Sequence, residues 1–369
     1  MKKIIKNRYI ALAVSLMMIG VFSFGLTGCG GSDSSDSAGS DEVFNQTMTV
    51  HSASTTAYAE ALDEWAAEMA EKSDGRLNIE ISYGGTIAAA ENTVDVTAEG
   101  GADLCWSTVP INNSKFKYIH IFSTFGEDLD NSMSATKALI DLYNDTSDLY
   151  GAFDALGLKL VGVHALTPNA LCAKDKKFES TDDFKGQAIM AISASNIAVL
   201  EGLGAVPMGI APTDLFENYS KNVCDASLVD ASLYESTSAY EEVGTWCTYN
   251  FSTCVCFIAM NQGVYDSLPD DLKALIDDSF ESLSMNCGEK VNTNYQNFVG
   301  IVKDSGIDVY DINPDLMAEV ENQIQTAVVE PWKKVCDEDG IDGDDFYNQF
   351  KETIEAAAEE YGDDYSWYK

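Results

Sequence analysis

The chain has 369 residues, and its 60 acidic side chains against 22 basic ones give a formal net charge of −38. Such a charge repels phosphate groups, so nucleic acid is excluded as a partner and anionic lipid headgroups are unfavourable neighbours. The length exceeds what one hydrophobic core usually holds, which predicts two lobes. We expect most of the acidity to lie on a solvated surface; the alternative is a field that attracts cationic ligands or metal ions.

The amino terminus carries an export signal. Residues 1–8 include four basic side chains, and an apolar run over 10–26 is followed by Thr-Gly-Cys at Cys29. A basic segment, a short apolar run and small residues before a cleavage point are typical of a secretory signal. The Leu-Thr-Gly-Cys sequence resembles a bacterial lipobox, which implies a lipoprotein signal peptide over 1–28 and lipidation of Cys29. The Gly- and Ser-rich segment 29–42 is predicted to be a flexible linker. The alternative is an uncleaved membrane anchor, and either version places the protein outside the cytoplasm, tethered to the membrane.

The first part of the exported chain alternates between strand and helix patterns. Phe44–Ser52 and Leu77–Tyr83 alternate like strands, and Thr55–Ser73 between them has one apolar face, as a helix does. This pattern predicts a parallel unit. Ala102–Ser107 is the next predicted strand, and Trp106 near its end either stacks on a ligand or belongs to the core.

The middle of the chain contains the expected crossings between lobes. Leu158–Ala165 is predicted to be a strand that leaves the first lobe, with a hinge at Thr167–Asn169. The apolar run Thr253–Met260 is predicted to cross back, and a long helix over Leu268–Val302 follows it. The predicted division is lobe I over 43–166 plus 255–296, lobe II over 167–254 plus 297–345, and a C-terminal helix over 346–369.

The most informative stretch is Phe178–Ala226. It is predicted to contain a turn, a strand over Gln187–Ile192, a Ser-rich turn at Ser193–Ser195 that caps a helix, and a returning strand over Val223–Val229. This is a βαβ unit. Open α/β sheets bind their ligands at the carboxyl ends of such strands.

Four short motifs in this stretch carry a family resemblance. They are Asp183-Phe184-Lys185-Gly186, Gly204-Ala205-x-Pro207, Asp214-x-Phe216 and Val223-Cys224-Asp225. In order and spacing they resemble the central signature of the solute receptors of TRAP transporters, of the DctP type. The resemblance implies a two-lobed α/β fold of the periplasmic-binding-protein kind, with a ligand cleft between the lobes and a long helix crossing both. It also implies a receptor rather than an enzyme, without cofactor, that binds a small organic ligand, usually a carboxylic acid, and delivers it to the membrane subunits of a TRAP permease.

One expected residue is missing. Receptors of this family usually carry an arginine in the strand after the turn, where it holds a carboxylate through two charge-assisted hydrogen bonds. The matching residue here is Met190, a second frequent arginine would fall near Ala170, and the chain's only arginines are Arg8 and Arg76. The family's glutamine, glutamate and asparagine after the last motif are replaced by Ser227, Leu228 and Val229.

These departures predict a ligand without an obligatory carboxylate, such as a neutral, amphipathic or amine-bearing molecule. The alternative is a carboxylate held by a lysine (Lys115, Lys117 or Lys174) or by backbone amides after Ser193. The residues expected to bind the ligand are Ser54, Thr55, Thr86, Trp106, Phe125, Asn169, Met190, Ser193, Ser195, Phe216 and Asp230.

Catalysis and metal binding have little support in the sequence. Common hydrolase, phosphate-binding and dinucleotide-binding motifs are absent, and so are Cys-x-x-Cys and His-x-x-x-His pairs. The eight cysteines beyond Cys29 allow disulfides or act as buried hydrophobic side chains. Three alternatives remain open: a ligand sensor of a signalling system without transport, a hydrolase using one of three histidines, and a receptor of an ATP-driven importer.

Overall fold

A computed structural model describes residues 42–126 and 128–367. The predicted signal peptide, the lipidation site Cys29 and nearly all of the predicted linker lie outside the described residues. The strands of the described part pair in the order β2–β1–β3–β9–β4–β7–β5–β6, and β8 joins β4 to β10. Their bounds are β1 Phe44–Val50, β2 Leu77–Ser82, β3 Leu104–Thr108, β4 Leu158–Ala173, β5 Ala188–Ala191, β6 Val206–Gly209, β7 Ala226–Asp230, β8 Thr245–Cys247, β9 Thr253–Asn261 and β10 Asp308–Tyr310.

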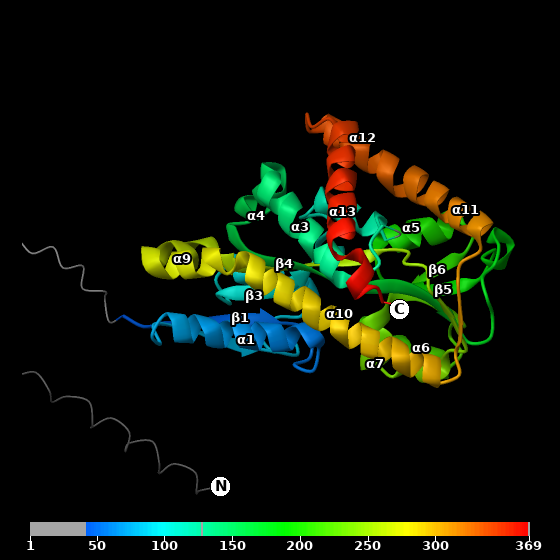
Figure 1. Ribbon diagram of the computed structural model, residues 1–369, viewed down its shortest axis with the longest axis horizontal. Coiled ribbons are helices and arrows are strands. Elements are labelled where there is room, and N and C mark those ends of the chain that lie inside the picture. Colours follow the sequence, from blue (N-terminus) through cyan, green and yellow to red (C-terminus); the bar gives the residue numbers. More distant parts are fainter. Residues whose placement is uncertain (1–41, 127, 368–369) are drawn as a thin grey trace, which may run out of the picture. The chain divides into compact units, whose positions relative to one another are not determined.

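Helices cover both faces of this sheet, and α10 runs along it from beside α1 to beside α6 and α7 (Figure 1). Their bounds are α1 Ala57–Lys72, α2 Thr93–Ala98, α3 Ser132–Asp145, α4 Ser147–Ala155, α5 Ala194–Gly202, α6 Leu215–Ser220, α7 Ala231–Ser236, α8 Gln262–Ser267, α9 Asp270–Asp278, α10 Phe280–Asp304, α11 Pro314–Ile324, α12 Glu330–Glu338 and α13 Gly343–Tyr365. The alternation of strands and helices follows the predicted α/β pattern.

Strand β4 joins two half-sheets. Its first part pairs antiparallel with β9, beside β1, β2 and β3, and its last part pairs antiparallel with β7, beside β5 and β6. The predicted hinge Thr167–Asn169 lies inside this continuous strand, at an irregularity in the β4–β9 register between Ala165 and Pro168. We call the β1–β3 side the first half-sheet and the β5–β7 side the second half-sheet. The chain therefore passes between the halves on two paired strands.

The side chains of the second half-sheet alternate strictly between its two faces. Ile189 and Ala191 of β5 belong to the large core that α5, α11 and α13 cover, whereas Met190 belongs to a separate core under α6, α7 and α10. A third core lies between α1 and the first half-sheet. Two covered faces explain why these strands are almost entirely apolar.

The predicted helix over Leu268–Val302 is wrong in one respect, because it is divided into α9 and α10 at Ser279. The Ser279 hydroxyl donates to the carbonyl of Ile276 at 2.8 Å and accepts the indole N–H of Trp65 at 2.9 Å. The Ile276 carbonyl also accepts the backbone N–H of Ser279 at 3.2 Å, so the hydroxyl adds a second, local hydrogen bond at the break.

Sequence patterns also missed two short strands and one helix distortion. Strand β6 contains Pro207 and lies at the sheet edge, where a proline removes no ladder hydrogen bond. The continuous helical stretch from α11 to α12 contains a π-helical turn at Gln325–Val329, just before Pro331. Proline cannot donate to the carbonyl four residues earlier, which favours such a turn. Strand β8, of three residues, was the other omission.

Candidate functional site

The candidate site lies where the carboxyl ends of strands from both half-sheets meet. The loops after β1 and β3 come from the first half, the loops after β5 and β7 come from the second, and Thr167–Asn169 of β4 lies between them. Ligands of open α/β sheets bind at such a place. Two groups of side chains occupy it.

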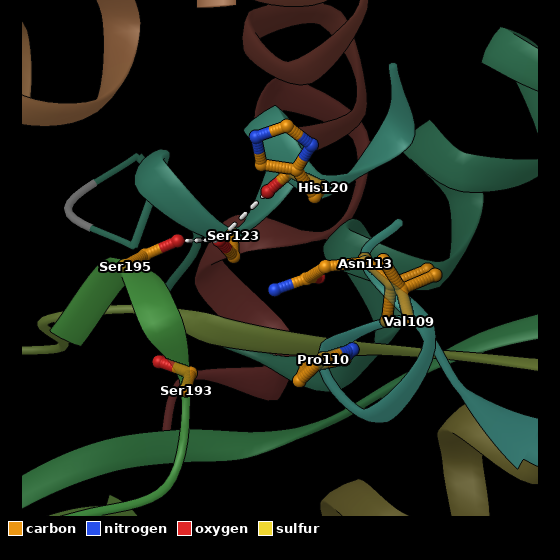
Figure 2. Close-up of a pocket in the computed structure, with 8 residues that line it drawn as sticks. Val109, Pro110, Asn113, His120, Ser123, Ser193 and Ser195 are labelled. Carbon is orange, nitrogen blue, oxygen red and sulfur yellow. Dashed lines mark hydrogen bonds between the residues drawn. The ribbon is translucent and has the colours of Figure 1, made fainter. Parts of the chain in front are cut away.

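The first group lines a small cavity (Figure 2). The second half-sheet contributes Ser193 and Ser195 from the start of α5, and the remaining lining residues are Val109, Pro110, Asn113, His120, Ser123 and Val255. The hydroxyls of Ser123 and Ser195 are 3.5 Å apart and join the two sides. The cavity volume is about 10 Å³, or about 230 Å³ with the space open to solvent. The smaller volume holds roughly one water, so an organic ligand needs the halves to open.

A buried amide network extends from this cavity to β4. Asn196 donates to the side-chain oxygen of Asn169 at 3.2 Å and accepts from the Ser252 hydroxyl at 2.8 Å. Asn169 in turn donates to the Ser252 carbonyl at 2.9 Å. The predicted cap of α5 is confirmed, since the Ser193 hydroxyl accepts from the backbone N–H of Asn196 at 3.1 Å. The network fixes the start of α5 against both crossing strands.

The second group centres on Asp230, which ends β7 and caps α7. Its Oδ1 accepts from the Thr167 hydroxyl at 2.8 Å and from the backbone N–H of Ser232 at 3.0 Å, and the Ser232 hydroxyl donates to it as well. Its Oδ2 is buried and has no hydrogen-bond partner among the described residues. Burial raises the pKa of the Asp230 carboxyl to about 6, against the effect of these hydrogen bonds.

An aromatic cluster from the first half-sheet contacts β4, the strand that also holds Asp230 through Thr167. Tyr58 of α1 stacks on Trp106 at 4.3 Å between ring centroids, and the Trp106 indole donates to Nε2 of His164 at 2.8 Å. His51 lies 5.1 Å from Trp106. Burial lowers the pKa of both histidines to about 4, so both are neutral at physiological pH. Burial raises the pKa of the Tyr58 phenol, so the phenol also stays uncharged at physiological pH.

The structure brings together five of the residues predicted to bind the ligand. Ser193, Ser195 and Asn169 belong to the cavity and its network, and Trp106 and Asp230 belong to the second group. Trp106 is only 1% exposed, so in this conformation it is a core residue that also faces the site.

The other predicted residues lie elsewhere or at the margin. Phe125 is buried against Tyr347 of α13, the Thr86 hydroxyl is 2.6 Å from that of Ser82, and Phe216 on α6 is 37% exposed. Of the remaining three, Ser54 and Thr55 lie exposed in the loop before α1, and Met190 is buried in the core under α6, α7 and α10.

Sequence reasoning missed Tyr58, Asn196 and Ser252. Asn196 offered one usable signal in the sequence, because it is a polar side chain at the start of the apolar run Ile197–Leu200. In the structure its side chain is only 2% exposed. A buried amide requires partners, which predicts a network. Tyr58 gave no comparable signal, since a tyrosine on the apolar face of a helix is usual.

A family model described as bacterial extracellular solute-binding protein, family 7 (DctP), matches residues 47–335. The chain belongs to this family. Its members are solute-binding receptors and not enzymes. A search of curated proteins finds no match.

Solved TRAP solute-binding proteins share the fold of this family 7 receptor. One from Desulfovibrio salexigens has a TM-score of 0.77 at 21% identity, over 86% of this chain and 97% of its own. One from a marine metagenome, described as specific for aromatic acids and bound to 3-hydroxybenzoate, has a TM-score of 0.77 at 19% identity, over 86% and 99%. One from Bordetella bronchiseptica, bound to mandelate, has a TM-score of 0.76 at 17% identity, over 85% and 99%. The predicted two-lobed α/β fold is thereby confirmed.

Three of the positions that we expect to depart from the family pattern lie in one place, whereas a fourth, Leu228, belongs to the core on the opposite face of the sheet. Ala170, Met190 and Val229 all belong to the core under α6 and α7, and each is at most 1% exposed. Ala170 pairs with Val229 across β4 and β7, and Met190 pairs with Ser227 across β5 and β7. Three separate substitutions in the sequence therefore form a single apolar surface.

The cations considered as substitutes for the missing arginine have other partners. Arg76, the one arginine among the described residues, lies 2.5 Å from Asp271. The three lysines are held as follows: Lys115 by Asp95 at 2.8 Å, Lys117 by Asp339, and Lys174 by the side-chain oxygen of Asn222 at 2.5 Å. Within the described residues, no helix is long and apolar enough to cross a bilayer.

Proposed function

We propose that this family 7 receptor is an extracytoplasmic, lipid-anchored receptor of a TRAP transporter whose ligand is a small organic molecule without an obligatory carboxylate. The observation that carries the ligand assignment is that Ala170, Met190 and Val229 are apolar and packed into a core, so none of these positions offers a carboxylate a charged partner. Burying a carboxylate without a charged or hydrogen-bonded partner costs several kcal/mol. A site without such a partner favours a ligand that carries no carboxylate.

The relatives provide the alternative. The solved proteins named above are described with 3-hydroxybenzoate and mandelate, and another, from Roseobacter denitrificans, with glucuronate. Each of these ligands carries a carboxylate. A carboxylate in the present receptor would need a lysine to leave its partner or the backbone N–H groups at the start of α5 to hold it.

Binding requires the two lobes to move. The small cavity and the contact between Ser123 and Ser195 support a closed form, and the irregularity at Thr167–Asn169 supports bending of the paired strands there. Lobe I would comprise 43–166 and 255–296 and lobe II 167–254 and 297–345. Signal cleavage before Cys29, lipidation of its thiol and the linker 29–42 would hold the receptor beside the permease subunits on the outer face of the membrane.

A thermal-shift experiment tests the ligand assignment. Benzoate, benzamide and benzyl alcohol share one ring and differ in charge and hydrogen bonding. We expect the amide or the alcohol to raise Tm of the mature protein more than benzoate does, and stabilisation by carboxylates alone would overturn the assignment. Small-angle scattering with a stabilising compound tests closure, and dimensions unchanged at saturation would contradict it.

A further inference from the structure

The buried carboxylate of Asp230 is incompletely satisfied. Thr167 and Ser232 supply every hydrogen bond that its Oδ1 accepts, while Oδ2 is buried and unpaired among the described residues. The residue is 9% exposed. A buried charged oxygen without a donor is unfavourable, so it calls for a specific explanation.

The position of Asp230 connects it to the altered ligand site. It directly follows Val229 in β7, and its strand partner on β4 is Asn169, next to Ala170. The acceptor thus lies beside the positions where this receptor has lost the donors usual in its family. The absence of cationic donors and the presence of an unpaired acceptor both favour a ligand of the opposite polarity to a carboxylate.

The surroundings of Asp230 also suit a cation. The carboxylate and the aromatic cluster are both held by β4, since Thr167 of that strand donates to Asp230 and Trp106, on which Tyr58 stacks, donates to His164 of the same strand. Aromatic faces attract organic cations, most strongly where water is excluded. Tyr58 comes from the first half-sheet and Asp230 from the second, so opening of the lobes would expose both to the entering ligand. The net charge of −38 further raises the local concentration of cations.

We propose that Asp230 is the anchor for a protonated amine and that the solute is an organic ammonium compound. The ammonium group donates to Oδ2, and the aromatic cluster of Tyr58 and Trp106 covers its other side. This inference rests on the function proposed above and narrows its ligand class.

The test compares ligands that differ only in their end group. Benzyl, 4-hydroxyphenethyl and butyl compounds are each used as amine, alcohol and carboxylate: benzylamine, benzyl alcohol and benzoate; tyramine, tyrosol and 4-hydroxyphenylacetate; putrescine, butanediol and succinate. Thermal shift identifies binders of the mature protein, and calorimetry measures their Kd. We expect at least one amine to bind more tightly than its alcohol and carboxylate.

The decisive variant is Asp230→Asn, with Asp225→Asn as the matched control. Asp225 precedes the same strand at its other end and is exposed. Removing one partner of a desolvated charge pair weakens binding by roughly 30-fold or more. We therefore expect that loss for the amine in Asp230→Asn and a change of less than about twofold in Asp225→Asn. Near-UV circular dichroism checks that each variant is folded.

A second measurement does not depend on the variant. Amine affinity of the wild type should fall as the pH drops through about 6, where Asp230 becomes protonated. The other titratable groups at this place are Tyr58, Cys256, His51 and His164, and all stay uncharged between pH 5 and 8 because burial shifts each pKa away from that range.

The outcomes separate the two proposals. Binding of alcohols but not amines overturns the role of Asp230 and leaves the proposed function in place, whereas binding of carboxylates alone overturns both. Amine binding that survives in Asp230→Asn, or no amine binding at all, also overturns the role of Asp230.

Discussion

Replacing Asp230 by asparagine should stabilise the protein at neutral pH. The folded-state pKa is raised from 3.8 to about 6 because the carboxyl is buried, and its hydrogen bonds offset only part of that effect. One pKa unit corresponds to about 1.4 kcal/mol, so the ionised carboxylate lowers the free energy of unfolding by about 3 kcal/mol. Asparagine has the same shape and no charge, and therefore removes this cost.

The effect has a defined pH window and sign. Between about pH 4 and 6 the folded protein holds the Asp230 proton more tightly than the unfolded chain does. Asp230 therefore does not lower the free energy of unfolding below about pH 4, where it is protonated in both states. It lowers the free energy of unfolding increasingly as the pH rises through 6. Relative to the wild type, Asp230→Asn should gain about 2.4 kcal/mol between pH 4 and pH 7.5.

Urea unfolding of both proteins at the two pH values measures this difference. Other carboxylates titrate in the same range, but they are common to both proteins and cancel in the comparison. Asp225→Asn, at the exposed end of the same strand, should show less than about 0.5 kcal/mol of such a change. An equal stability difference at pH 4 and pH 7.5 would refute the reasoning, because the carboxyl would then be solvated or paired.

Three further predictions follow from packing. Met190→Leu should lower the free energy of unfolding by less than about 1.5 kcal/mol, and Met190→Arg should lower it by about 3 to 5 kcal/mol, because position 190 is fully buried and apolar. Urea unfolding measures both values. An arginine that leaves the stability unchanged would mean that its side chain reaches a polar cleft. Gly126→Ala should cost about 3 kcal/mol because its Cβ would lie 2.3 Å from the carbonyl oxygen of Asn250, whereas Gly209→Ala meets no atom within 4 Å and should change stability by less than about 1 kcal/mol. Of the eight thiols in the described residues, only half-buried Cys254 should react with an aromatic disulfide reagent in the native protein, and rapid reaction of a second thiol would contradict the burial of the others.

Much of the fold could be predicted because alternation and helical spacing are local signals. The strands and helices from Phe44 to Ser107 and the βαβ unit after Phe178 are confirmed at their predicted positions, with small shifts of their ends. The continuity of β4 could not be predicted. Pro168 interrupts its pattern and suggests a break, but the structure accommodates the proline at a register irregularity opposite Thr253. Local sequence does not show which partner strand tolerates a missing N–H.

The site was predictable where polar residues follow a strand in sequence. Ser193 and Ser195 met that condition, and the structure places both at the cavity. The hydrogen-bond partners of Asn196 could not be predicted in this way, because Asn169 lies 27 residues away in the sequence and Ser252 lies 56 residues away. Contacts of that kind depend on how β4 and β9 cross, which is a property of the whole fold.

The missing arginine was visible in the sequence, but its meaning depended on the fold. A cation from elsewhere in the chain could compensate for methionine at position 190. The structure shows that Ala170 and Val229 pack in the same core as Met190, and that Asp230, the next residue after Val229, pairs with Asn169 on β4. On the proposal that Asp230 holds an amine, the three apolar positions and the unpaired carboxylate have one physical explanation: a site that excludes a carboxylate gains nothing unless it also stabilises what replaces it. The cost of about 3 kcal/mol that we assign to the unpaired carboxylate would then be recovered when the ligand donates to it. A variant such as Asp230→Asn should accordingly be more stable when empty and weaker in binding, and these two effects must be observed together.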